Sequence, residues 1–143
     1  MRLRLWEKRD CERIAKLEEE CFSDPWSLQA VEETSLRQDF VGLVIEEDGA
    51  IQGYVGCLFA FEQADVLLIA VSKNYRGKGY GKLLLEKMLD LLKINQVKSV
   101  FLEVRKSNAV ARACYIGRGF KEIAVRKGYY SNGEDAIIME KQI

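Results

Sequence analysis

The residues that decide the fold are Val66-Leu67-Leu68-Ile69-Ala70-Val71-Ser72-Lys73-Asn74-Tyr75-Arg76-Gly77-Lys78-Gly79-Tyr80-Gly81-Lys82. The first six form an apolar run typical of a buried strand, and residues 83–92 carry apolar side chains at helical spacing. Three glycines at alternate positions therefore lie between a strand and the first turn of a helix. Free backbone N–H groups and the positive end of the helix dipole favour anions at such a turn.

Two common phosphate-binding loops do not fit residues 76–82. The nucleoside triphosphate loop needs Gly, four residues and then Gly-Lys-Ser/Thr, but counting from Gly77 places Lys82 where the second glycine should stand. The dinucleotide fingerprint Gly-x-Gly-x-x-Gly also fails, because its last glycine would fall on Lys82 when counted from Gly77 and on Leu84 when counted from Gly79. What remains is Arg76-x-x-Gly79-x-Gly81 after a strand. By itself this pattern suits an ordinary helix-capping turn as well as a ligand loop.

Length and charge indicate the broad class of the protein. A chain of 143 residues can bury a sizeable core, and we expect a single domain over residues 1–143. It carries 22 basic and 22 acidic residues, so no overall field draws it to nucleic acid or to a membrane surface. No apolar run is long enough to span a bilayer, and residues 1–7 lack a signal-peptide core. We therefore expect a cytoplasmic protein.

The cysteines and the absence of histidine limit the possible chemistry. Four cysteines are scattered without a Cys-x-x-Cys pair, and there is no histidine. A zinc site and a Cys–His or Ser–His nucleophile pair are therefore not expected, and we predict no metal and buried reduced thiols. Any proton transfer must use Glu, Asp, Tyr, Lys, Cys or water.

Hydrophobic periodicity and turn residues predict an α/β fold. Leu3 and Leu5 alternate with arginines in a first half-buried strand, Asp10 and Ser27 are expected to cap two helices, and residues 63–65 are expected to form a turn. The crossover through residues 66–105 predicts two parallel strands in one mixed central sheet flanked by helices. The expected strands are 2–5, 41–45, 51–61, 66–71, 99–105, 120–127 and 136–139, and the expected helices follow Asp10, Ser27, the glycine loop and Asn108.

Three polar side chains accompany the strand 99–105 and the helix after it. Glu103 interrupts an apolar strand, so its carboxylate either pairs with a neighbour such as Arg105 or reaches the crevice beyond the strand ends. Asn108 opens the next helix, where an N-cap is its common role. Tyr115 lies about two turns further on the same helix face, and buried tyrosines are usually core residues.

Taken together, residues 66–120 resemble the GNAT superfamily of N-acetyltransferases. The resemblance rests on three patterns in the right order and spacing: Arg76-x-x-Gly79-x-Gly81, Leu102-Glu103-Val104-Arg105-x-Ser107-Asn108, and Ala113-Cys114-Tyr115 followed by Gly119-Phe120. It implies a GNAT-like fold with acetyl-coenzyme A (acetyl-CoA) bound at the glycine loop between the strand 66–71 and the following helix.

The two ends of the chain resemble the bacterial ribosomal-protein-alanine N-acetyltransferases. The matching patterns are Phe22-x-x-Pro25-Trp26-Ser27, Arg126-Lys127-Gly128-Tyr129-Tyr130 and Glu134-Asp135-Ala136-Ile137-Ile138-Met139. This resemblance implies that the acceptor is a protein N-terminus, the N-terminal alanine of a small-subunit ribosomal protein. Three residues depart from the usual pattern: Arg76 replaces a frequent glutamine, Cys114 a leucine and Gly128 an asparagine.

The same resemblance implies roles for individual residues. Glu103 would be the base that accepts the amine proton, directly or through water, and Tyr115 the acid that protonates the leaving thiolate. An N-terminal amine has a pKa of about 8, against about 10.4 for lysine, so a modest base suffices at neutral pH. The residues implied in coenzyme binding are Ile69, Ala70 and Val71 for the acetyl carbonyl and pantetheine arm, Gly77, Lys78, Gly79, Tyr80, Gly81 and Lys82 for the pyrophosphate, and Asn108 for the arm.

Other functions stay open from the sequence. One is a GNAT acetyltransferase acting on lysine side chains or small amines. Another is a CoA-binding module without catalysis, which the presence of both Glu103 and Tyr115 disfavours. Tyr129 and Tyr130 either line a peptide slot or pack across strands of a terminal hairpin. With no net charge and no basic run, contact with nucleic acid is not supported.

Overall fold

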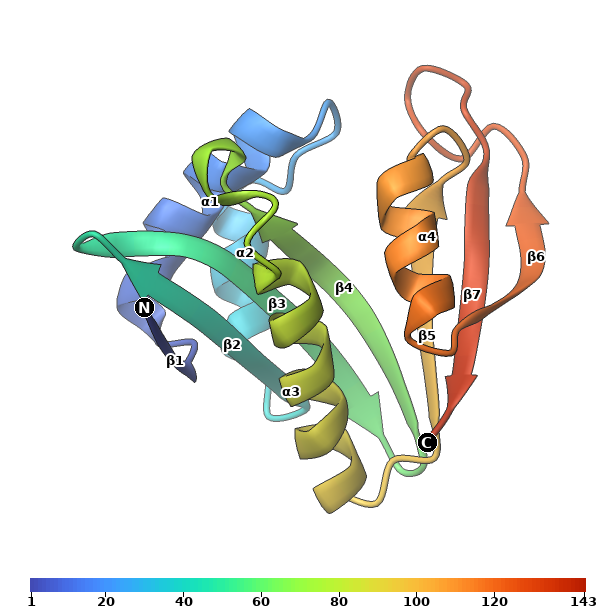
Figure 1. The fold of residues 1–143 in the computed structure, drawn as a ribbon, viewed down its shortest axis with the longest axis horizontal. Helices are drawn as coiled ribbons and strands as arrows, with labels where there is room; N and C mark the ends of the chain where they lie inside the picture. The colour runs from blue at the N-terminus through green and yellow to red at the C-terminus, as the bar shows by residue number, and fades with distance from the viewer.

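The computed structural model describes all residues, Met1–Ile143, and contains one seven-stranded sheet in the order β1-β2-β3-β4-β5-β7-β6 (Figure 1). The predicted order of elements is confirmed, as is the parallel pairing of the two central strands, β4 and β5. The strands are β1 (Arg2–Leu5), β2 (Phe40–Glu47), β3 (Ala50–Ala60), β4 (Gln63–Val71), β5 (Ser99–Arg105), β6 (Lys121–Arg126) and β7 (Ala136–Gln142). The helices are α1 (Cys11–Cys21), α2 (Leu28–Ser35), α3 (Tyr80–Ile94) and α4 (Ala109–Gly117).

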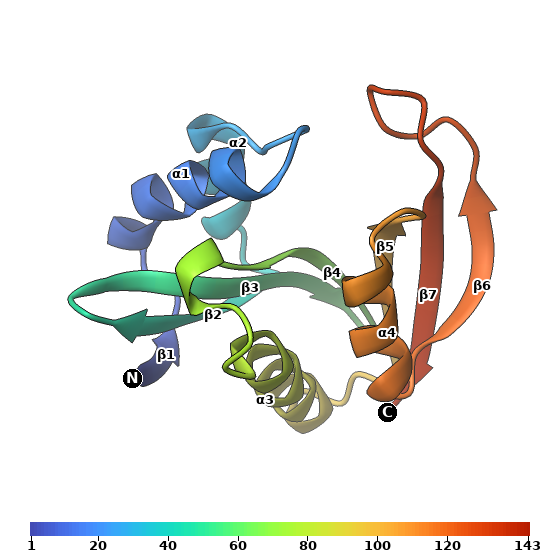
Figure 2. The same cartoon turned by 45° about the horizontal axis from the view of Figure 1, so that its top comes forward.

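Helices cover both faces of the first half of the sheet (Figure 2). Successive side chains of β2 point to opposite faces of the sheet. Val44 packs with α1 and α2 on one face, whereas Leu43 and Ile45 pack with α3 on the other. Burial on both faces explains why β2, β3 and β4 read as nearly continuous apolar runs. The helix α4 lies over β5 on the same side of the sheet as α3, since Tyr115 of α4 joins the core cluster of α3.

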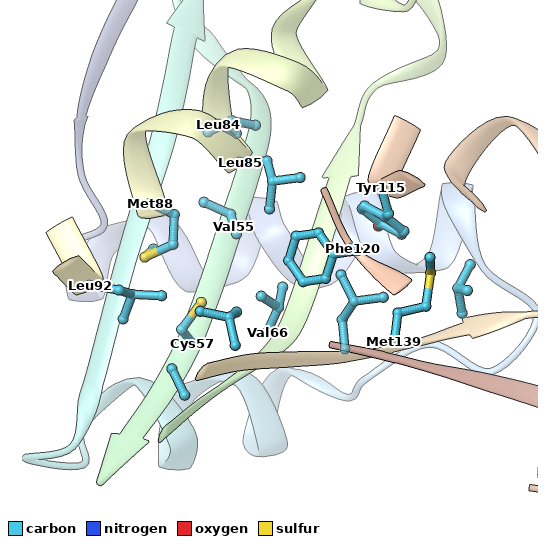
Figure 3. Packing of buried hydrophobic residues seen from close by; sticks show 14 of the residues in the cluster. Val55, Cys57, Val66, Leu84, Leu85, Met88, Leu92, Tyr115, Phe120 and Met139 are labelled. Atoms are coloured by element: carbon cyan, nitrogen blue, oxygen red, sulfur yellow. The ribbon is translucent and has the colours of Figure 1, made fainter. Parts of the chain in front are cut away.

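The larger core cluster lies between α3 and the sheet (Figure 3). Four α3 side chains at helical spacing are fully buried there: Leu84, Leu85, Met88 and Leu92. Phe120, just after α4, continues this cluster to Tyr115, and their ring centroids are 6.1 Å apart. One core therefore fixes the position of α4 relative to α3. None of the helices is long and apolar enough to cross a membrane.

The two central strands pair over only part of their length. Residues 63–66 of β4 face residues 99–102 of β5, and no pair follows Val66 and Leu102. At this point Leu67 forms a bulge, because Gly56 of β3 lies opposite Leu68 and Cys57 lies opposite Val66. A bulge bends its strand and increases the local twist. Beyond Leu67, β4 therefore stays with β3 and diverges from β5, as Figure 1 shows.

The first strand differs from the prediction. Leu5 is 60% exposed, whereas Arg4 turns its guanidinium inward, 2.8 Å from Asp10 and 2.7 Å from Glu46. Asp10 is the N-cap residue of α1 as predicted, but its side chain accepts from Arg4 and from the N–H of Glu7 and makes no capping hydrogen bond to the helix. Burial alone would raise the pKa of Asp10, but these hydrogen bonds hold it below its usual value. A buried charge needs such partners, and the ion pair decides the orientation of the strand.

Two local predictions have opposite outcomes. Ser27 caps α2 as expected, since its Oγ accepts from the Ala30 N–H at 3.1 Å. Residues 63–65 were expected to form a turn, but they belong to β4 and pair with both β3 and β5. The turn comes earlier, at Phe61, which has a φ of 56° and is 95% exposed. Pairing on two sides outweighs the weak turn preference of Gln63 and Asp65.

The packing of Trp6 gives a stability prediction. A Cβ on Gly42 would lie 2.8 Å from Trp6 Cε3, so Gly42→Ala should overpack the core and destabilise the protein by about 1–3 kcal/mol. Gly117→Ala is the control, because a Cβ there would meet nothing within 4 Å and alanine suits a helix. Urea unfolding of both variants measures the difference. Equal unfolding midpoints would contradict the close approach of Trp6.

Candidate functional site

The free edge of β4 forms one wall of the site. The Ser72 N–H donates to Gln52 O on the β3 side at 2.7 Å. Beyond Val66 and Leu102, β4 and β5 separate and leave an opening between them. Because the backbone N–H and C=O groups of a strand point alternately to its two sides, those of Ile69 and Val71 point into this opening. The Val71 carbonyl accepts from Arg76 Nε at 3.0 Å. Of the three residues predicted here, Ala70 instead directs its backbone to β3, where it pairs with Tyr54.

The glycine loop lies at the end of this wall. Gly77 and Gly79 both have a φ of 82°, and a Cβ on either would meet nothing within 4 Å. Gly79 is the N-cap residue of α3 and has no side chain to occupy the first free N–H groups of the helix. These residues leave open space at a positive helix end, which suits a pyrophosphate. The loop therefore fits the predicted coenzyme through its backbone.

The side chains of the loop are partly held by the β2–β3 hairpin. Lys78 Nζ lies 3.8 Å from Glu47 and 4.9 Å from the ring centroid of Tyr75. The Tyr80 hydroxyl donates to the same carboxylate, and this hydrogen bond raises the pKa of Tyr80 to about 12. Of the two lysines predicted to meet the pyrophosphate, Lys78 is thus paired within the protein. Lys82 is exposed in the first turn of α3 and makes no ion pair.

Glu103 lies just past the last β4–β5 pair, on the face of β5 turned away from the α3 core. Its side chain is 31% exposed, and its carboxylate lies 3.4 Å from Arg126 Nε on β6. The expected alternative of pairing with Arg105 is wrong, because Arg105 pairs with Asp24 and Glu134. The Glu103 charge raises the pKa of Tyr129. The carboxylate is thus placed at the opening between β4 and β5.

Tyr115 approaches the same opening from the other face of the sheet. Its side chain is only 8% exposed, and it packs in the core cluster with Leu102 and Val104 of β5. Its hydroxyl has no hydrogen-bond partner within the protein. Burial raises the pKa of Tyr115, so the phenol keeps its proton. Because no strand fills the opening, a ligand held there meets groups from both faces.

Asn108 has the common role expected at a helix start. Its Oδ1 accepts from the Ala111 N–H at 3.2 Å and caps α4. This bond fixes the turn between β5 and α4 beside the opening. Contact between Asn108 and the coenzyme stays a prediction.

Arg105 is the residue that the sequence did not single out. It is the last residue of β5, and its guanidinium lies 2.8 Å from Asp24 and 3.1 Å from Glu134. The Tyr130 ring stacks on it at 3.9 Å, and Tyr129 packs edge-on against Tyr130 at 5.2 Å. The interpretation that the two tyrosines pack across strands of a hairpin is therefore wrong, since both lie in the loop between β6 and β7. No local pattern indicates Arg105, because its hydrogen-bond partners are 27 to 82 residues away.

The comparison with known families agrees with this geometry. A family model described as the acetyltransferase (GNAT) family matches residues 11–120. The chain belongs to this family and is an acetyltransferase, an enzyme class whose members use acetyl-CoA. The matched range includes α1, the diverging strands, the glycine loop and α4.

Individual relatives are similar over nearly the whole chain. The ribosomal protein bS18-alanine N-acetyltransferase of Haemophilus influenzae is 36% identical over 134 residues, which cover 91% of this chain and 90% of that protein. The protein of the same name from Escherichia coli is 32% identical and covers 86% of this chain and 84% of that protein. The crystal structure of an Escherichia coli ribosomal-protein alanine N-acetyltransferase gives a TM-score of 0.93 at 30% identity, over 99% of this chain and 93% of that chain.

The glycine loop gives a binding prediction. Gly79→Ala should weaken CoA binding by about tenfold or more, because the Cβ enters the space beside the α3 N-terminus and strains a left-handed residue. Gly133→Ala is the control, since Gly133 has a similar φ of 85° and lies in the β6–β7 loop. Isothermal titration calorimetry with CoA compares them. Equal losses of affinity in both variants would mean that strain alone is responsible.

Proposed function

We propose that this protein transfers the acetyl group of acetyl-CoA to the α-amino group of an N-terminal alanine, on a small-subunit ribosomal protein. The observation that carries the proposal is the placement of Glu103 and Tyr115 on opposite faces of the sheet at one opening. The names of relatives that are 32–36% identical over most of their length support the choice of acceptor. Retention of a base and an acid disfavours a non-catalytic binding module.

The residues of the opening fit an acetyl thioester, which acetyl-CoA supplies. The backbone groups of Ile69 and Val71 face the opening and are available to hold the acetyl carbonyl and the pantetheine amides. The free N–H groups at the start of α3 hold the pyrophosphate. An acetyl thioester held at both ends would present its carbonyl carbon to Glu103 on one face of the sheet and to Tyr115 on the other.

Glu103 is the proposed base. An N-terminal ammonium group with a pKa of about 8 loses its proton readily near neutral pH, and the carboxylate accepts that proton directly or through one water. Glu103 then releases this proton to solvent. The neutral amine forms the C–N bond to the thioester carbon while the C–S bond breaks, and the nitrogen loses its second proton to solvent as the amide forms. Arg126, 3.4 Å away, orients the carboxylate at the edge of the opening.

Tyr115 is the proposed acid. Its buried phenol keeps a proton and has no partner in the protein, so its O–H is free to donate to the departing sulfur. The phenolate then recovers a proton from solvent. Core packing against Phe120 fixes the ring and so limits the positions from which it donates.

Two peptides test the function. Thiol release from acetyl-CoA is followed with one peptide that begins with a free alanine and contains no lysine, and with another that has a blocked N-terminus and one internal lysine. We expect turnover on the first peptide only. Turnover on the second alone would overturn the proposal in favour of a lysine acetyltransferase. Absence of turnover on both, with CoA still bound, would favour a small amine acceptor.

The two proposed catalytic side chains give a kinetic prediction. Glu103→Gln and Tyr115→Phe should each lower kcat on the alanine peptide by about 10²–10⁴-fold and leave the Kd for CoA unchanged. Glu140→Gln is the control, because Glu140 lies on the same sheet face opposite Phe101, away from the opening. Unchanged turnover in either variant would remove that residue from the mechanism.

The protonation of Tyr115 gives a pH prediction. Burial raises the pKa of Tyr115 above its ordinary value of about 10, so the donor form persists to that pH or beyond. The wild-type kcat should therefore show no alkaline decrease from loss of this proton below about pH 10. A decrease near pH 8 that disappears in Tyr115→Phe would contradict the expected burial of the phenol.

A further inference from the structure

The tip of the β2–β3 hairpin contacts the glycine loop through two carboxylates. Glu47 is the last residue of β2, and Asp48 and Gly49 form the turn after it. We propose that Glu47, through its hydrogen bond with Tyr80, is a positioning residue that holds the loop in the form that binds the coenzyme pyrophosphate. This inference rests on the part of the proposed function that places the pyrophosphate at the start of α3, and it is independent of the acceptor.

One carboxylate oxygen holds both neighbours of Gly79. Glu47 Oε2 accepts from the Tyr80 hydroxyl and lies 3.8 Å from Lys78 Nζ. Gly79, between these two residues, is the N-cap residue of α3 and has a φ of 82°. The free N–H groups of the helix follow directly after it. Glu47 therefore fixes the chain on each side of the residue that sets the direction of these groups.

Asp48 holds the start of the same loop. Its carboxylate accepts from the hydroxyl of Tyr75, which ends the short 3-10 helix Lys73–Tyr75. Lys78 Nζ lies 4.9 Å from the ring centroid of Tyr75 and 5.9 Å from that of Tyr80, so one ammonium group contacts both rings. The hydrogen bonds to the carboxylates raise the pKa of Tyr75 and that of Tyr80, the latter to about 12. Both phenols therefore stay donors at neutral pH.

The hairpin tip is itself firmly held. Asp48 and Gly49 have φ values of 55° and 79°, the backbone of a tight two-residue hairpin turn. The Glu47 carbonyl accepts from the side chain of Gln52 at 3.1 Å, and Gln52 is buried in β3. The backbone carbonyl of Gln52 in turn accepts from the Ser72 N–H, at the start of the glycine loop. The tip is thus a fixed support for the loop.

A loop with two left-handed glycines needs such a support. Gly77 and Gly79 both have a φ of 82°, and glycine loses more conformational freedom on ordering than any other residue. A loop that is ordered before the ligand arrives spares the binding step this loss and so increases affinity. The hydrogen bond from Tyr80 to a charged acceptor is the stronger contact, because the Lys78 side chain of the ion pair is 48% exposed.

Charge alone gives the opposite expectation for Glu47. A carboxylate beside an anion site repels a pyrophosphate, and this one also pairs with Lys78, a lysine predicted to meet the pyrophosphate. If charge dominated, loss of the carboxylate would strengthen CoA binding. If Glu47 positions the loop, its loss weakens CoA binding. The sign of the change in affinity therefore decides between the two roles.

Glu47→Ala tests the proposal by isothermal titration calorimetry with CoA. We expect the Kd for CoA to rise about tenfold, because the loop must then be ordered by the ligand. Glu47→Gln keeps an acceptor for the Tyr80 hydroxyl and should stay within about threefold of the wild type. Unchanged or tighter binding in Glu47→Ala overturns the proposal, and equal losses in the two variants overturn it as well.

Tyr80→Phe removes the other half of the contact and changes no charge. The Kd for CoA should rise by a factor similar to that of Glu47→Ala, and the double variant should bind about as weakly as either single variant. If the Tyr80 hydroxyl instead met the coenzyme, the two losses would multiply. That result would contradict the proposed contact.

Glu86→Ala is the matched control. Glu86 lies further along α3 and pairs with Arg118 at 2.6 Å, so the variant loses the same side chain and one ion pair from the same helix. Its Kd for CoA should stay within about twofold of the wild type. If the loss equals that of Glu47→Ala, the effect is a general loss of stability in α3 and the proposal is overturned.

Hydrogen exchange gives a readout without coenzyme. The amide protons of residues 75–80 should exchange faster in Glu47→Ala and Tyr80→Phe than in the wild type or Glu86→Ala. Unchanged exchange in free Glu47→Ala overturns the proposal. If Gly79→Ala weakens CoA binding but Glu47→Ala does not, the inference alone fails. If neither variant weakens it, the proposed pyrophosphate site fails and the role of Glu47 fails with it.

Discussion

The divergence of β4 from β5 is the constraint on which the rest of the structure depends. The bulge at Leu67 bends β4 directly after its last pair with β5, so one edge of residues 67–71 keeps no partner strand. Unpaired backbone groups inside a protein need other partners. The opening that results is bounded by the α3 N-terminus at one end, by Glu103 on one face of the sheet and by Tyr115 on the other.

Core packing keeps the divergent strands in place. The α3 side chains bury themselves against β2, β3 and β4, and Phe120 continues that cluster to α4 and β7. The two halves of the sheet are thus held by one core even where their central strands separate. Rigid surroundings matter for the proposed chemistry, because a donor or acceptor displaced by about 1 Å can lose much of its effect.

Two arginines organise the edges of the fold through charge. Arg4 brings β1, the start of α1 and β2 together through Asp10 and Glu46, and Arg105 does the same for the loops beside the opening through Asp24 and Glu134. In both cases one guanidinium lies between two carboxylates, so each charge is compensated when it leaves water. The first network stabilises the packing of β1, and the second joins the two loops at the open end of β4 and β5.

The sequence by itself determined the elements and their order, because these follow from local signals. The apolar run before Gly77, the glycines at alternate positions and the leucines of α3 identify a strand, a loop and a helix, and the crossover makes β4 and β5 parallel. Glu103 and Tyr115 came from the family resemblance, since periodicity alone reads them as an ion pair and a core residue. Only the tertiary structure decided that β4 and β5 separate at Leu67, that Arg4 is turned inward, that Glu103 pairs with Arg126 and that Arg105 joins two loops. The physical reason is that these features depend on partners up to 82 residues apart, which no local pattern records.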